Sequence, residues 1–189
     1  MTRNLRILAV LGLIAGGVLG MAGSIVASDH VRAVCWAIDG VGVIIATMIM
    51  ALTFVRSGRL EVAAGFLIYA VGESVMLGGT AMSLQQSVPA FAAGTALWCA
   101  GLTLTSVPRV FATWTRLAGL ISAVLFGTVS ITIFRGIPLT PITHPLPFFA
   151  YPFLVITFIG WIVAIVSHGA EFGIDARAAA NPEEKLAVR

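Results

Sequence analysis

The stretch AVCWAIDGVGVIIATMIMALTFV, residues 33–55, decides the fold class. It stays apolar from end to end and carries a single charged side chain, Asp39. A helix of this length covers about 35 Å at a rise of about 1.5 Å per residue, which exceeds the roughly 30 Å hydrocarbon core of a bilayer. A helix that is apolar on all sides must be surrounded by protein or lipid, so this stretch predicts a transmembrane helix.

Five further stretches show the same pattern: 7–27, 62–84, 88–107, 117–134 and 146–167. Each has about 18 to 23 residues, whereas a transmembrane β-strand needs only about 9–11 residues and alternates in polarity. The connections are short, so neighbouring helices are expected to be antiparallel. We therefore predict an all-α polytopic membrane protein with six transmembrane helices in an up-down bundle. We expect the first helix to be retained, because it is longer than the apolar part of a signal peptide.

The composition agrees with membrane lipid as the main partner. The chain is 59% hydrophobic and 10% charged, while a soluble domain carries about 25% charged residues. The net charge of +3 does not indicate nucleic-acid binding, because the basic residues are scattered singly and form no patch. Both cysteines lie in apolar stretches, so a disulfide framework is not expected.

The basic residues also predict the orientation. Nine of the 11 lie on the side of the N-terminus, namely Arg3, Arg6, Arg56, Arg59, Arg109, Arg116, Arg177, Lys185 and Arg189. Only Arg32 and Arg135 lie on the other side. Cytoplasmic loops carry the excess of Lys and Arg, so both termini are predicted to be cytoplasmic, in a bacterial inner membrane. Residues 1–168 form the predicted six-span domain, and 169–189 a short polar cytoplasmic tail. Trp36 and Tyr151 are expected at the outer interface as aromatic anchors.

Two acidic residues lie inside the predicted helices. Asp39 is expected about 10 Å below the outer surface and Glu73 near the middle of the membrane. A charge at the centre costs about 2.5–3.5 kcal/mol or more to insert, so neither side chain is expected to face lipid. One hypothesis is an outward-facing polar pocket lined by Asp39, Glu73, Tyr69 and Arg135. The alternative is a polar contact between helices, in which Asp39 pairs with Arg135 or Arg32 and Glu73 binds a hydroxyl or a backbone carbonyl.

The segment RGIPLTPITHPLPFFAYPF, residues 135–153, is rich in proline. Proline removes a backbone donor and keeps the residue before it out of the helical region, so the sixth helix cannot be regular before about Phe148. Backbone that is not helical must be covered by protein at the membrane edge. The segment is therefore a candidate cap over the outer mouth of the bundle, or else a stiff connector. Its candidate cap residues are Pro138, Pro141, His144, Pro145 and Pro147.

Signatures of cofactors, metals and catalysis are missing from the sequence. The only lysine, Lys185, lies in the tail, which excludes a retinal Schiff base in the bundle. His30, His144 and Asp39 have no spacing typical of a metal site. Neither G-x-S-x-G nor H-E-x-x-H occurs. We expect a protein without cofactor, metal or enzymatic activity.

The layout resembles small six-span bacterial inner-membrane proteins of unknown function. The similarity rests on the acid early in the second span (Trp36 to Asp39), on Pro108-Arg109 followed by Leu117-Ala118-Gly119, and on the stretch from Trp161 to Gly169. It covers most of the chain and implies no established activity.

Two functions remain open on these residues. The first is an accessory or scaffold subunit that packs against other membrane proteins or forms a homo-oligomer. Its support is the scarcity of polar groups and two rows of glycines that allow close helix contact, Gly12, Gly16 and Gly20, and Gly65, Gly72 and Gly79. The second is a small transporter or binder of a cation or hydrophobic solute that uses Asp39 and Glu73.

Overall fold

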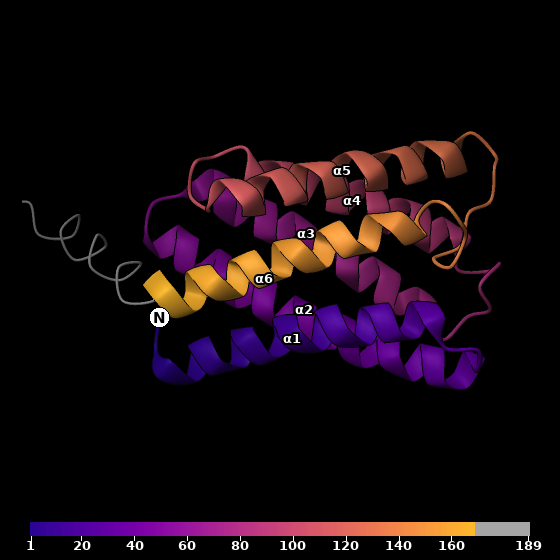
Figure 1. The fold of residues 1–189 in the computed structure, drawn as a ribbon, viewed down its shortest axis with the longest axis horizontal. Helices are drawn as coiled ribbons and strands as arrows, with labels where there is room; N and C mark the ends of the chain where they lie inside the picture. The colour runs from indigo at the N-terminus through magenta and orange to yellow at the C-terminus, as the bar shows by residue number, and fades with distance from the viewer. Residues whose placement is uncertain (169–189) are drawn as a thin grey trace, which may run out of the picture.

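The computed structural model describes residues 1–168, and this part of the chain contains helices and no strands (Figure 1). The elements are α1 (Arg3–Ile25), α2 (Asp29–Arg56), α3 (Leu60–Gly79), α4 (Val88–Ser106), α5 (Thr113–Phe134), the short 3₁₀ helix η1 (Phe148–Ala150) and α6 (Tyr151–His168). Within residues 1–168, six helices are long and apolar enough to cross a membrane, which confirms the predicted all-helical class. The predicted tail, 169–189, lies outside the described residues.

The helices form a closed bundle. Each α-helix packs against the next one in the chain, and α6 contacts both α5 and α1 (Figure 1). The turns at 26–28, 80–87 and 135–147 gather at one end, which we name the proline-loop end. The N-terminus and the turns at 57–59 and 107–112 lie at the opposite end, which we name the N-terminal end.

Glycines let neighbouring helices approach closely inside the bundle. A Cβ atom at Gly12 of α1 would lie 2.3 Å from the carbonyl oxygen of Gly42 in α2. A Cβ atom at Gly65 of α3 would lie 2.9 Å from the carbonyl oxygen of Gly101 in α4. Members of both predicted glycine rows therefore face other helices of the same chain, which is the close packing that small residues permit between membrane helices.

Aromatic side chains fill the N-terminal half of the bundle. Phe54 stacks on Phe66 at 5.6 Å between ring centroids, and Trp161 of α6 meets Phe66 edge-on at 4.8 Å. Phe111, from the turn before α5, packs edge-on against Phe54 at 5.8 Å. These four side chains are buried, and such ring pairs stabilise a fold by about 0.5–1.5 kcal/mol beyond their burial.

The third helix is shorter than the sequence pattern predicts, since it ends at Gly79 and not at Leu84. Gly78 and Gly79 have low helix propensity. Thr80 then ends the helix, because both its backbone N–H and its hydroxyl donate to the Leu77 carbonyl, at 3.1 and 2.8 Å. Glu73 is consequently six residues from the helix end, about 9 Å. The expected depth of Glu73, near the middle of the membrane, stays a prediction.

The sixth helix begins as the prolines predict, with η1 from Phe148 and regular α-helix from Tyr151. The outside of the bundle is strongly apolar. Ile25, Val124 and Val18 are 71%, 68% and 62% exposed, and many other large apolar side chains face outward. A surface of this kind suits lipid as its solvent and indicates a multi-pass membrane protein.

Candidate functional site

A cavity occupies the half of the bundle that the aromatic core leaves open. It has a volume of about 770 Å³ including its open mouth, and its walls come from α1, α2, α3, α4 and α6. Thr80, Ser87 and Pro141 line it at the proline-loop end. Asp39 and Glu73 both face this space, so two acids that are distant in the sequence belong to one site.

The carboxyl group of Asp39 lies where α1 has no side chains. A Cβ atom at Gly20 would be 2.8 Å from Asp39 Oδ2, and one at Gly16 would be 3.1 Å from Asp39 Oδ1. These two glycines therefore make the room that the carboxyl group occupies. Within residues 1–168, Asp39 forms neither a hydrogen bond nor an ion pair.

Glu73 is only 6% exposed and projects from α3 toward α2. A Cβ atom at Gly40 of α2 would lie 3.3 Å from Glu73 Oε1, so a glycine again makes room for a carboxyl group. The Trp98 indole N–H of α4 lies close enough to this carboxyl group to interact with it as a hydrogen-bond donor. The two carboxyl groups are close enough to interact electrostatically.

Two polar groups at the cavity are buried without a close hydrogen-bond partner among the described residues: the Tyr69 hydroxyl and the Trp98 indole N–H, whose neighbour is the Glu73 carboxyl group. Their rings stack on each other, with centroids 5.3 Å apart and planes within 1° of parallel. Both side chains interact electrostatically with Glu73. Buried polar groups in folded proteins nearly always have partners, so this cluster of unpaired groups calls for an explanation.

The stacked pair forms the floor of the cavity. Tyr69 meets Trp161 of the aromatic core edge-on at 5.9 Å, and Trp98 meets Phe126 at 4.9 Å. Tyr151 also packs edge-on against Phe126, at 5.5 Å, and lines the cavity from the start of α6. Aromatic packing therefore fixes the rings around the two acids in place.

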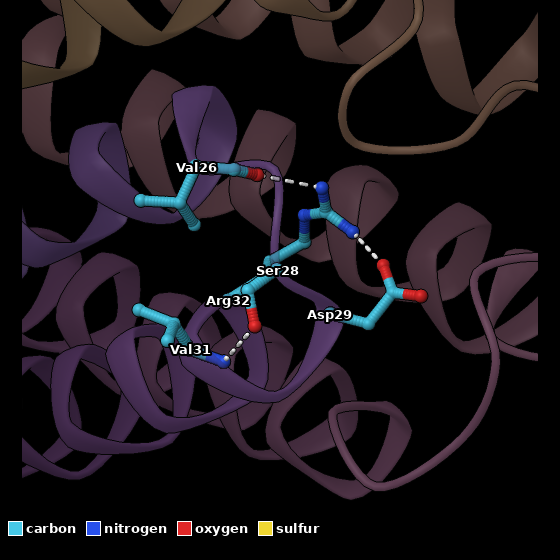
Figure 2. A network of polar contacts seen from close by, with 5 residues as sticks. All are labelled: Val26, Ser28, Asp29, Val31 and Arg32. Atoms are coloured by element: carbon cyan, nitrogen blue, oxygen red, sulfur yellow. Dashed lines mark hydrogen bonds and ion pairs between the residues drawn. The ribbon is translucent and has the colours of Figure 1, made fainter.

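The nearby arginines are engaged elsewhere or point away. Arg32 forms an ion pair with Asp29 and donates to the carbonyl oxygen of Val26 at 2.7 Å, which ties the start of α2 to the end of α1 (Figure 2). Arg135 follows α5 as its exposed C-cap and does not line the cavity. Of the four side chains predicted for a pocket, the structure thus brings together Asp39, Glu73 and Tyr69, but not Arg135.

The proline segment reaches the cavity at one point. Pro141 is buried and lines the mouth, while Pro138, His144 and Pro145 are exposed and Pro147 is buried away from it. The hydroxyl of Thr143 accepts a hydrogen bond from the Thr140 N–H at 2.9 Å and holds the turn around Pro141. The His144 ring packs against the Phe148 ring at a tilt, with centroids 4.3 Å apart, and does not line the cavity.

Sequence reasoning missed three aromatic residues of the site. Trp36 and Tyr151 match the pattern of interface anchors, yet both line the cavity. Trp98 lies in an apolar stretch and gives no signal of its own. One signal was present: Gly16 and Gly20 share a helical face, and a smooth face is what a neighbouring carboxyl group needs.

Comparisons of this chain with protein-family models, with characterised proteins and with solved structures find no match. Within residues 1–168, no group of three or more His, Cys, Asp or Glu side chains could hold a metal ion.

Proposed function

We propose that this membrane protein binds a positively charged solute in the cavity between α2 and α3, as a small transporter or binder without enzymatic chemistry. One observation carries the proposal: the carboxyl groups of Asp39 and Glu73 face the same space, and no Lys, Arg or His is among the described residues that line it. A bound cation would provide the positive charge that the two carboxyl groups lack among the residues around them.

The unpaired state of these acids favours binding over a purely structural role. A structural contact between helices would satisfy each carboxyl group, because an unsatisfied polar group at membrane depth is costly. Here Arg32 is held by Asp29, so neither Asp39 nor Glu73 forms an ion pair within residues 1–168, and Glu73 meets only the neutral Trp98 N–H. Acidic side chains that lie in a cavity at membrane depth without a cationic partner are typical of ligand-binding sites.

The scaffold hypothesis loses part of its support. One of its two supports was the rows of glycines, but Gly12 packs on α2 and Gly65 packs on α4. The close contacts made by these glycines lie inside one chain. An accessory role remains the second candidate, and a stable complex with a different membrane protein after gentle extraction would favour it.

We further propose that the proline-loop end faces outward across a bacterial inner membrane, with both termini in the cytoplasm. The nine-to-two distribution of Lys and Arg supports this orientation. Reporter fusions after Gln85 and Thr140 should report the outer side, and fusions after Gly58 and Arg189 the inner side. Inverted results would reject the orientation and leave the cavity proposal intact.

The binding proposal is tested by chemical accessibility. Dicyclohexylcarbodiimide, an apolar reagent for carboxyl groups in apolar surroundings, is added to the full-length protein in detergent, and the modified residues are mapped by mass spectrometry. We expect modification at Asp39 or Glu73 and protection by at least one of three probes: sodium, calcium or trimethylphenylammonium chloride. Glu61, exposed on the same helix as Glu73, serves as the control residue. Unreactive acids, or reactive acids that no probe protects, would reject the proposal.

A further inference from the structure

We infer that the cation is an organic ammonium ion with apolar substituents rather than a metal ion; this inference rests on the proposed function and specifies its ligand. Three features of the cavity lead to it: the oxygen supply, the aromatic rings and the charge balance.

The oxygen supply is too small for a metal ion. Ca²⁺ takes about 6–8 oxygen ligands, and Mg²⁺ requires near-octahedral coordination. The described cavity wall offers two carboxyl groups and a few hydroxyls, among apolar side chains such as Leu77, Leu154 and Phe158. These apolar walls would not replace the water shell of a small inorganic ion, but they suit a cation that carries hydrocarbon groups.

The aromatic rings match an ammonium ligand. Trp36, Tyr69, Trp98 and Tyr151 line the cavity together with the two acids. Cations bind over the faces of such rings, with Trp the strongest, and cages of aromatic side chains bind quaternary ammonium groups. The Arg32 guanidinium group already lies 6.0 Å from the centre of the Trp36 ring, so this ring accepts a cation on one face in the structure itself.

The charge balance favours a single positive charge. Among the described lining residues, α1 and α4 provide no acidic or basic side chain, α2 provides Asp39, α3 provides Glu73 and Tyr69, and α6 provides Tyr151. The proline segment contributes Pro141 and no charge. Two carboxylates side by side repel each other, so a monocation would pair with one carboxylate while the other keeps its proton. The proton released from the first carboxyl group leaves to water as the cation enters.

The cavity also has room for such a ligand. It is lined at its mouth by Thr80, Ser87 and Pro141 and is open there, so a ligand can enter and extend beyond it. The Trp98 N–H lies beside the Glu73 carboxyl group as a hydrogen-bond donor, and this contact becomes stronger once that group is charged. Ligand binding would therefore provide the reason for the unpaired polar groups at the floor.

The test compares a cation with a neutral molecule of the same shape. Trimethylphenylammonium, tert-butylbenzene and sodium are titrated separately into the full-length protein in lipid nanodiscs, with tryptophan fluorescence as the readout. We expect saturable binding of the ammonium ion, and affinity at least about tenfold lower for tert-butylbenzene, the change expected when one charge contact is absent. Asp39→Asn and Glu73→Gln should each lose about tenfold or more in affinity for the ammonium ion. Glu61→Gln is the matched control and should bind like the wild type.

The outcomes distinguish failure of the ammonium inference from failure of the proposed cation-binding function. Equal affinity for tert-butylbenzene and the ammonium ion would reject the charged ligand, and with it the proposed cation function. Binding of sodium alone, weakened in Glu73→Gln, would reject the ammonium inference and keep the proposed function. Melting curves of every variant are recorded first, so that loss of binding is read only from folded protein.

Discussion

The two halves of the bundle are built from the same helices and differ in what fills them. In the N-terminal half, Phe54, Phe66, Phe111 and Trp161 pack ring against ring. In the half toward the proline-loop end, the centre is a cavity with Asp39 and Glu73 on its walls. The first half supplies stability, and the second half places polar groups where they are costly.

The helix α3 runs through both halves and shows how the aromatic core gives way to the acidic cavity. On α3, Phe66, Tyr69 and Glu73 follow one another at spacings of three and four residues, so they share one face. That face is purely apolar at Phe66, carries a hydroxyl at Tyr69 and ends in a carboxyl group at Glu73. The aromatic half thus positions the acids, because Tyr69 packs against Trp161 on one side and lines the cavity on the other.

The largest loss of stability is expected in the N-terminal half of the bundle, where the aromatic rings pack together. Trp161→Ala removes a side chain that is 1% exposed and contacts Phe66, Tyr69 and Phe158, so it should lower the free energy of unfolding by about 3–5 kcal/mol. Tyr151→Ala, at the cavity wall, should cost much less. Thermal unfolding of both variants in one detergent checks the contrast, and equal losses would contradict the division into two halves.

A smaller effect is expected where α1 meets α2. Gly12→Ala would place a methyl group 2.3 Å from a backbone oxygen, and overpacking of this kind costs about 1–3 kcal/mol. Gly17→Ala, whose Cβ would meet only Val155 at 3.7 Å, is the control and should melt like the wild type. If both variants were neutral, the close contact between α1 and α2 would not hold.

The two acids at the cavity, Asp39 and Glu73, should make the stability of the protein depend on pH. A carboxyl group inside the bundle is stable when neutral, and charging it there is costly, while the unfolded chain bears the charge freely. The melting temperature should therefore fall as the pH rises between about 5 and 9, by the equivalent of about 1 kcal/mol or more. Glu73→Gln should flatten this curve. A wild-type curve that is flat, or that rises with pH, would count against neutral buried acids.

The smallest effect is expected at Arg135. Its side chain is exposed and lies outside the cavity wall, so Arg135→Gln should change stability by no more than about 0.5 kcal/mol. It should also leave ammonium binding unchanged. If Arg135→Gln clearly lowered the affinity for the ammonium ion in a fluorescence titration, Arg135 would belong to the binding site, as the sequence analysis suggested.

The sequence was sufficient for the helices because membrane thickness sets their length. The N-terminal ends of α1, α2 and α5 lie four residues before the predicted apolar stretches, but five of the six α-helices have C-terminal ends within about two residues of the prediction. The third does not, because Gly78, Gly79 and Thr80 are apolar enough to extend a hydropathy pattern but poor at extending a helix. The predicted end of the third helix therefore lies five residues beyond the observed one.

The site was harder to predict because its members meet only through packing. Asp39, Glu73 and Tyr69 stand out as polar residues in apolar stretches, and the structure places all three at the cavity. Trp98 and Tyr151 reach it through the rotation of α4 and α6, which side-chain packing sets and spacing in the sequence does not.

The position of α6 has a consequence for how the protein is made. Chains emerge from the ribosome N-terminus first, so α1 to α5 are available before the last helix. The helix α6 fills the gap between α5 and α1 and brings Tyr151, Leu154 and Phe158 to the cavity wall. The bundle of helices therefore stays open on this side during most of synthesis. Until α6 arrives, the two acids have no wall on one side, so the cavity cannot take its final shape before α6 has been made.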